Sequence, residues 1–423
     1  MIIHVVQPGE TIYSIADYYD VSPIILIQEN SITDPNNLVI GSSIVILYPE
    51  TTHMVRPGDT VDSIANNYGI SIMQLLRNNP HIADLGLRAG EVLVISYTDD
   101  KIREITTNGY SYPFIHSATL RKTLPFLTYL TVFYYQITEG ANLVDIDDQN
   151  IIQLAKEYGV APIMLISTMA TDGSHDTDLS STILNSEELQ NSLIANALEI
   201  LRSKGYYGLN INIPFVKPED RDNFITLVER FSSILKQDGF ELFITIYPTS
   251  LPHEIGINER NYYAALGQAA DQTLLLSYEW ATTANAPLGV TSYALIREYL
   301  DLAVTLIPSD KISIGIPTIG YIAQMPFIEG ESRANSISIE FAIDLAREVG
   351  ATIYFDYSTQ TPFFQYSNDT SNLVWFKDAR SIETLTQLVP FYGFNGVGLW
   401  NIMRFFTQMW LIINSQYDIK KIL

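Results

Sequence analysis

The chain of 423 residues contains no cysteine and few positive charges. The absence of cysteine excludes disulfides, thiolate chemistry and cysteine-ligated zinc, although it does not identify a cellular compartment. Only 24 Lys and Arg stand against 47 Asp and Glu, and the resulting net charge of -23 would repel nucleic acid and anionic lipid. No apolar run approaches the roughly 20 residues that span a bilayer. We therefore expect neither nucleic acid nor a membrane as a partner.

The composition is that of a folded chain with more than one domain. Hydrophobic residues make up 47% and charged residues 17%, which argues against disorder. The length suggests two or three domains. The start, residues 1–6, has no basic region and reaches Gln7-Pro8-Gly9 too soon for a signal peptide. We expect the protein to be made in the cytoplasm without a signal peptide.

The first hundred residues contain a tandem repeat. The run Val-x-Pro-Gly-acid-Thr from Val6 to Thr11 recurs from Val55 to Thr60, and the same spacing relates Asn30 to Asn79. In each copy a β-rich run stops at Pro-Gly, and the acid and Thr then open a helix with an apolar stripe. A second short helix and a final β-rich run follow. The period predicts two copies of one unit with the order strand, helix, helix, strand.

In these features the two copies resemble a pair of LysM modules, which bind glycans that contain N-acetylglucosamine. The resemblance covers residues 1–49 and 50–98. It implies a glycan groove in each copy, between the loop before the first helix and the turn after the second. Carried over by position, the glycan-binding residues are Gly9, Glu10, Thr11, Ile12 and Asn30 in the first copy and Gly58, Asp59, Thr60, Val61, Asn79 and Ile82 in the second. The alternative that each side chain only makes a turn or a helix cap stays open.

The remainder, residues 99–423, alternates β-rich runs with helical stretches, which predicts an α/β fold with a parallel sheet. Together with a first strand near Ile105, eight strands can be assigned. The other seven are residues 125–135, 161–169, 206–213, 240–247, 273–280, 311–317 and 396–401. Eight strand–helix units in about 320 residues fit a TIM (β/α)8 barrel, whose active site lies at the C-terminal ends of the strands.

The fourth of these strands carries Gly-Tyr-Tyr-Gly-Leu-Asn-Ile-Asn-Ile-Pro from Gly205 to Pro214. This run resembles the signature of glycoside hydrolase family 18, in which Gly-x-x-Gly-hydrophobic-Asn/Asp leads into Asp-aromatic-Glu. Asn212 stands where the Asp that orients the substrate's acetamido group belongs, and Pro214 stands where the proton-donating Glu belongs. Pro214 has no proton to donate, and Asn212 has no charge. The resemblance therefore implies a sugar-cleaving scaffold without an intact catalytic pair.

Other parts of the barrel sequence resemble the family's substrate site. The end of the sixth strand resembles the family's Met-x-Tyr-Asp, with Tyr278 in the place of the Tyr that steadies the acetamido group and Glu279 keeping an acid. Trp400 matches the Trp under the central sugar. The resemblance assigns glycan contacts to Tyr278, Trp280 and Trp400, although these aromatic side chains could instead fill the barrel mouth as core. The Trp-Phe-x-Asp-x-Arg run from Trp375 resembles the family's small α/β insertion, expected at about 350–385.

Two LysM modules before such a barrel resemble the spore cortex-lytic N-acetylglucosaminidases of endospore-forming bacteria. This resemblance implies peptidoglycan or another N-acetylglucosamine-containing glycan as the partner, spore-coat proteins as further partners, and deposition on the spore, in the coat or exosporium. No cofactor is expected. No metal is expected either, because His116, His175 and His253 lack ligand spacing.

Three functions are compatible with these features. The favoured one is a glycan-binding protein that does not hydrolyse its ligand. The second is an active N-acetylglucosaminidase that cleaves cortex fragments with a relocated acid, for which Glu279 is the candidate. The third is a structural protein of the spore surface.

Overall fold

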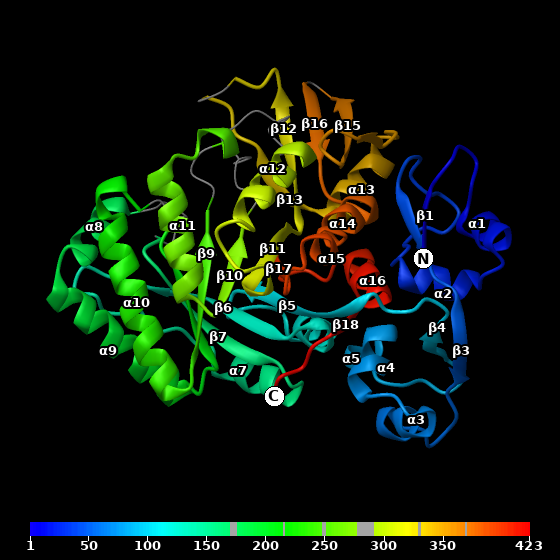
Figure 1. The fold of residues 1–423 in the computed structure, drawn as a ribbon. Coiled ribbons are helices and arrows are strands. Elements are labelled where there is room, and N and C mark those ends of the chain that lie inside the picture. Colours follow the sequence, from blue (N-terminus) through cyan, green and yellow to red (C-terminus); the bar gives the residue numbers. More distant parts are fainter. Residues whose placement is uncertain (170–175, 215, 248–250, 277–291, 329–330, 369) are drawn as a thin grey trace.

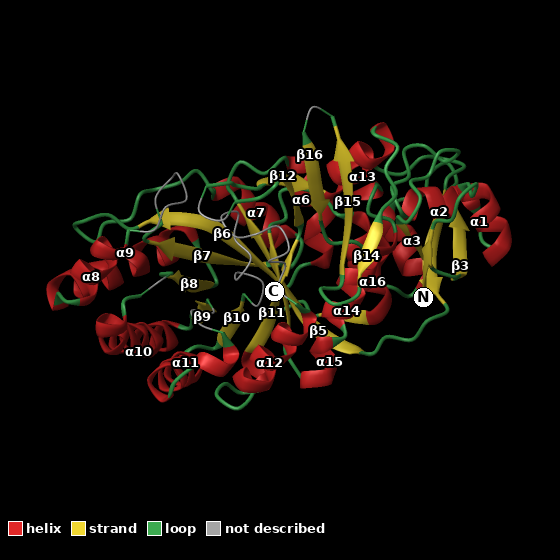
Figure 2. Ribbon diagram, turned by 90° about the horizontal axis from the view of Figure 1, so that it is seen from above, coloured by secondary structure: helices red, strands yellow, loops and turns green. Residues whose placement is uncertain are grey.

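The computed structural model describes the chain except for residues 170–175, 215, 248–250, 277–291, 329–330 and 369. Eight parallel strands form a closed barrel in which the last strand pairs with the first (Figures 1 and 2). The strands are β5 (Arg103–Ser111), β6 (Tyr129–Gln136), β7 (Ala161–Ser167), β8 (Gly208–Asn212), β9 (Glu241–Ile246), β10 (Gln272–Leu275), β11 (Ile312–Pro317) and β17 (Gly396–Trp400). The predicted TIM barrel is confirmed, and each predicted strand overlaps an observed one.

Helices surround the barrel, so its strands are buried on both faces (Figure 2). They are α6 (Ser117–Thr123), α7 (Gln149–Glu157), α8 (Thr177–Leu184), α9 (Glu187–Lys204), α10 (Arg221–Asp238), α11 (Ile257–Ala269), α12 (Tyr293–Ala303), α14 (Ala379–Thr386) and α15 (Leu388–Tyr392). A short strand, β18 (Tyr417–Ile419), pairs with the start of β5. The C-terminal tail therefore lies at the end of the barrel opposite the predicted site. Among the described helices, none has both the length and the apolar character to cross a membrane.

A five-stranded antiparallel sheet is inserted between β11 and β17. It consists of β12 (Ile319–Met325), β13 (Asn335–Ser338), β14 (Tyr354–Asp356), β15 (Thr361–Ser367) and β16 (Ser371–Trp375), with α13 (Ile339–Glu348) between β13 and β14. The predicted start of this insertion, near residue 350, is wrong. Only Thr318 separates β11 from β12, so the chain passes from the barrel into the insertion without a loop.

Module 1 has the predicted order of elements, and module 2 has the same order with one additional short helix. Module 1 (residues 1–49) contains β1 (Ile2–Val5), α1 (Ile12–Tyr19), α2 (Pro23–Glu29) and β2 (Ser43–Ile46). Module 2 (residues 50–98) contains α3 (Val61–Tyr68), α4 (Ile72–Asn78), α5 (Ile82–Leu85) and β4 (Val92–Tyr97), and its first strand, β3 (Pro49–Met54), begins one residue before the predicted boundary. The two strands of each module pair antiparallel, and each module has its own small apolar core. The short helix α5 has no counterpart in module 1 and packs against α6 of the barrel.

One helix of the barrel domain, α16 (Thr407–Gln416), lies against both modules (Figure 1). Every residue of α16 after the first is buried. The Gln408 side-chain amide donates to Asn30 Oδ1 of module 1 (3.1 Å), and the Asn414 amide donates to Asn78 Oδ1 of module 2 (2.9 Å). Breaking such bonds would leave buried polar groups without partners, which costs about 1–3 kcal/mol each. Both modules are therefore held in defined positions on the barrel.

The two modules dock on the barrel through different surfaces. A Cβ atom added to Gly41 of module 1 would lie 1.8 Å from the carbonyl oxygen of Ile353, so only glycine permits this approach. The equivalent Gly90 of module 2 has no atom within 4 Å of such a Cβ. Module 2 is instead joined to the barrel by Arg77, whose Nη1 donates to the carbonyl of Pro125 (3.1 Å). The two copies of the repeat therefore contact the rest of the protein through different residues.

The modules also contact each other. Gln28 Nε2 of module 1 lies 2.6 Å from His81 Nδ1 of module 2. The Tyr97 hydroxyl of module 2 donates to Glu29 Oε1 of module 1 (2.7 Å). Burial raises the pKa of Glu29 from its usual 4.5 to about 7, and the hydrogen bond from Tyr97 only partly opposes this shift. Near neutral pH the intermodule contact thus contains a carboxyl group that is partly protonated.

Glu29→Gln is expected to stabilise the protein at alkaline pH. A raised pKa means that folded Glu29 binds its proton more tightly than the unfolded chain does, so stability falls as pH rises from about 4.5 to about 7. The neutral amide avoids this loss. We predict a gain of about 1–3 kcal/mol at about pH 8 and little difference at about pH 4.5, measured by urea unfolding of both proteins. A variant that is equally stable to wild type at both pH values would contradict the prediction.

Candidate functional sites

The loop before α1 is a turn held together by its acidic residue. Gly9 has φ +84°, in the left-handed region that favours glycine. Glu10 Oε2 accepts from the backbone N–H of Gln7 (2.7 Å) and lies 2.8 Å from His4 Nε2. Module 2 repeats this arrangement with Gly58, Asp59, Arg56 and His53. The carboxylates therefore shape the loops that the sequence assigns to glycan binding.

Thr11 and Thr60 cap the first helix of each module. The Thr11 hydroxyl accepts from the Ser14 N–H (3.2 Å), and the Ser14 hydroxyl accepts from the Thr11 N–H (3.0 Å). Thr60 and Ser63 form the same reciprocal pair. These bonds satisfy N–H groups that a helix leaves unpaired at its start. The glycan contacts of the two threonines stay a prediction beside this structural role.

Asn30 and Asn79 are buried and bond to the backbone. The Asn79 amide nitrogen donates to the carbonyls of Leu75 (3.0 Å) and Val94 (2.7 Å), and its oxygen accepts from the Val94 N–H (2.8 Å). Asn30 makes the equivalent three bonds in module 1. Each asparagine thereby ties the end of the second helix to the last strand. It supports one wall of the predicted glycan groove, and direct contact with a glycan stays a prediction.

The apolar residues assigned to the grooves are partly core residues. Ile12 and Ile82 are buried, whereas Val61 is half-buried. The N–H of Ile12 donates to the carbonyl of Pro35 (3.0 Å). In module 1 the structure thus brings together the two predicted walls, the loop before α1 and the turn after Asn30.

Asn212 and Pro214 lie at the C-terminal end of β8, in the mouth of the barrel, where the sequence predicts them. Both are buried. Asn212 Oδ1 accepts from the Tyr247 hydroxyl (2.7 Å), and its amide nitrogen has no acceptor among the described residues. Sequence reasoning missed Tyr247, although it directly follows β9, the neighbouring strand, at the same edge of the barrel.

The polar layer beneath this site is uncharged. The Asn210 amide donates to the Tyr110 hydroxyl (2.8 Å), and the Thr245 hydroxyl lies 3.3 Å from Asn210 Oδ1. Burial raises the pKa of Tyr110, so its hydroxyl stays protonated. None of the residues that end the eight barrel strands carries a carboxylate. These residues are Ser111, Gln136, Ser167, Asn212, Ile246, Leu275, Pro317 and Trp400.

Aromatic rings surround Trp400 at the barrel mouth. The ring centroid of Trp400 lies 4.7 Å from that of Phe133, 5.8 Å from that of Tyr110 and 6.4 Å from that of Tyr112. Trp400 itself is half-buried, so part of its surface remains accessible. The other predicted contacts, Tyr278, Glu279 and Trp280, lie outside the described residues. Across the described part of the chain, no group of three His, Asp or Glu side chains is placed to hold a metal ion.

Comparison with known proteins agrees with this architecture. Residues 95–404 match the family model of glycosyl hydrolases family 18, and residues 4–47 and 53–96 match that of the LysM domain. The chain therefore belongs to glycosyl hydrolase family 18 and carries two N-terminal LysM domains.

Among individual proteins, the chain is similar to the cortical fragment-lytic enzyme of Bacillus subtilis (strain 168). The two are 33% identical over 430 residues, covering 100% of this chain and 99% of that protein. Among solved structures it is similar to the spore cortex-lytic enzyme SleL of Bacillus megaterium QM B1551, with TM-score 0.82 and 26% identity over 100% of this chain and 99% of that one. The Bacillus cereus SleL structure gives TM-score 0.80 and 26% identity over 99% of both chains.

Asn79→Ala is expected to destabilise module 2 because three buried backbone groups lose their partner. We predict a loss of about 2–3 kcal/mol in the free energy of unfolding, measured by urea denaturation. Asn67→Ala, at an exposed position of α3, is the matched control and should change stability by less than about 0.5 kcal/mol. Equal stability of the two variants would show that the hydrogen bonds of Asn79 to Leu75 and Val94 do not stabilise module 2.

Proposed function

We propose that this protein binds peptidoglycan or a related N-acetylglucosamine-containing glycan on the bacterial spore and does not hydrolyse it. The observation that carries the proposal is the pair Asn212 and Pro214 at the end of β8. Together they leave the end of β8, where family 18 has its catalytic acids, without a proton donor.

In this family the substrate's own acetamido group supplies the nucleophile. What the enzyme must supply is a proton for the leaving oxygen. General acid catalysis contributes about 10²- to 10⁴-fold. Pro214 is buried and has no N–H or acidic group, and Asn212 is neutral and bonded to Tyr247. The strand ends add no carboxylate among the described residues. These features support binding without turnover.

Binding needs less than catalysis does, and the mouth keeps the groups for it. The amide nitrogen of Asn212 is a donor suited to the carbonyl of an acetamido group. Trp400 presents an aromatic surface of the kind that packs against a sugar ring. The two LysM domains add further glycan-binding surface on the same rigid chain.

The proposed location on the spore rests on relatives. Proteins similar over nearly the whole chain are described as cortical fragment-lytic or spore cortex-lytic enzymes. A chain with the same domains but without the acid would bind spore peptidoglycan at the same place, with spore-coat proteins as neighbours.

The direct test compares wild type with the double variant Asn212→Asp/Pro214→Glu on cortex fragments. We predict that wild type binds insoluble peptidoglycan in a pull-down but releases no reducing sugar above background. The double variant should release product at least about 100-fold faster, because it regains a proton donor and a charge beside the acetamido group. Asn212→Asp alone is the control and should stay at background.

Turnover by the wild-type chain would overturn the proposal and favour a relocated acid. A wild type that binds no peptidoglycan would favour a purely structural protein. A double variant without turnover and without affinity for oligosaccharides would show that the barrel mouth is not a sugar site.

A further inference from the structure

A groove of about 890 Å³ runs between the two LysM modules, apart from the barrel mouth. One wall is formed by α2 of module 1 and the residues before it, including Ile24 and Gln28. The other wall is formed by the α5–β4 segment of module 2, including Leu85, Arg88 and Glu91. Its volume lies in the range of about 300–1,000 Å³ that is usual for ligand sites. The size of the groove is therefore suited to several sugar units of a chain.

The floor of the groove is fixed by polar contacts between the modules. Gln28 from one module and His81 from the other are hydrogen-bonded there, and His81 Nε2 lies 2.5 Å from Glu91 Oε1. Since α16 also anchors each module to the barrel, the two walls cannot separate freely. A ligand would meet a groove that is already formed, which reduces the ordering cost of binding.

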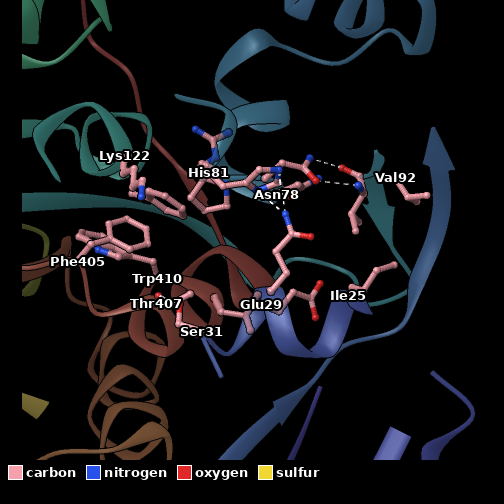
Figure 3. A pocket seen from close by; sticks show the side chains of 17 residues that line it. Ile25, Glu29, Ser31, Asn78, His81, Val92, Lys122, Phe405, Thr407 and Trp410 are labelled. Atoms are coloured by element: carbon pink, nitrogen blue, oxygen red, sulfur yellow. Dashed lines mark hydrogen bonds between the residues drawn. The ribbon is translucent and has the colours of Figure 1, made fainter. Parts of the chain in front are cut away.

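Behind this floor lies a smaller pocket of about 100 Å³, where both modules meet α16 (Figure 3). Figure 3 shows Glu29 and Ile25 of module 1, His81 and Asn78 of module 2, and Trp410 of α16 around it. Gln28 and His81 line both spaces. The small pocket has room for a few water molecules only, so the groove in front of it is the space for a ligand.

The walls combine exposed apolar surface with a balanced set of charges. Ile24 is 74% exposed and Leu85 is 55% exposed, one on each wall. Exposed apolar groups that converge on a groove indicate a binding surface. Arg88 offsets one of the two acids, Asp20 and Glu91, so a polyanion would gain little here. Sugar rings with acetamido groups offer apolar faces and neutral donors and acceptors, which match this lining.

We infer that this intermodule groove binds a β-1,4-linked N-acetylated amino-sugar chain that lies across both LysM modules. The inference rests on the proposed glycan-binding function. It adds a site that neither module contains alone and that is lined by none of the residues assigned to the grooves within the modules. The Gly90 turn, which is open in module 2, belongs to this groove, whereas its counterpart Gly41 is covered by Ile353 of the insertion. The asymmetric docking of the modules thus leaves one glycine turn free for a ligand.

The test uses the full chain and the hexamer of N-acetylglucosamine, with affinity measured by isothermal titration calorimetry. Leu85→Arg and Ile24→Arg each place a long charged side chain on one wall. We expect each to weaken hexamer binding about tenfold or more. Both positions are exposed, so thermal unfolding should show intact folding. The matched control is Met54→Arg, which makes the same change at a residue that is 63% exposed and outside the groove. It should bind like wild type.

The same series in a Trp400→Ala background reduces binding at the barrel mouth and should give the same order of affinities. Wall variants that bind the hexamer as tightly as wild type would overturn the proposed binding site. Met54→Arg with the same loss of hexamer affinity as the wall variants would overturn it too. If wild type binds neither hexamer nor peptidoglycan, the proposed function itself fails. If wild type binds and the wall variants do not differ from it, only the groove is wrong.

Discussion

Helix α16 is the element on which the arrangement of the whole protein depends. Its amide side chains are bonded to Asn30 in one module and Asn78 in the other, within a buried interface. Trp410 of the same helix is 1% exposed and packs on Phe126 of the barrel at 5.0 Å between ring centroids. Buried amide pairs tolerate little change in geometry, because a broken pair leaves unsatisfied groups. These contacts hold the two modules at defined positions beside the barrel.

The barrel beside these fixed modules has Asn212 and Pro214 at the end of β8, where family 18 has its acids. With these two residues there, the end of β8 carries no charge, and the network of Asn210, Tyr110 and Thr245 beneath is neutral as well. Removing buried carboxylates is often neutral or favourable for stability, so catalysis can be lost while the fold persists. On the proposed function, glycan binding persists after the same change, because hydrogen-bond donors and aromatic surfaces need no titratable group.

Much of the fold could be predicted from the sequence, because strand periodicity and the tandem repeat are local signals. The barrel strands and the order of elements in module 1 were found in this way, whereas the third helix of module 2, α5, was not. The start of the inserted sheet was missed because β12 follows β11 after a single residue, with no loop to mark the boundary. The docking of the modules was also missed, since Gln408 and Asn30 meet only in three dimensions. For the site, position alone placed Asn212 correctly. It did not reveal the cap of Thr11 or the bond from Tyr247, which depend on partner atoms that no motif encodes.

A crystal structure of the wild-type protein soaked with an N-acetylglucosamine oligosaccharide would show whether the barrel mouth binds a sugar chain without cleaving it. We expect an uncleaved chain in the barrel mouth, with an acetamido carbonyl at the Asn212 amide nitrogen and a sugar ring on Trp400. A cleaved product, or a carboxyl group within hydrogen-bond distance of the glycosidic oxygen, would contradict it.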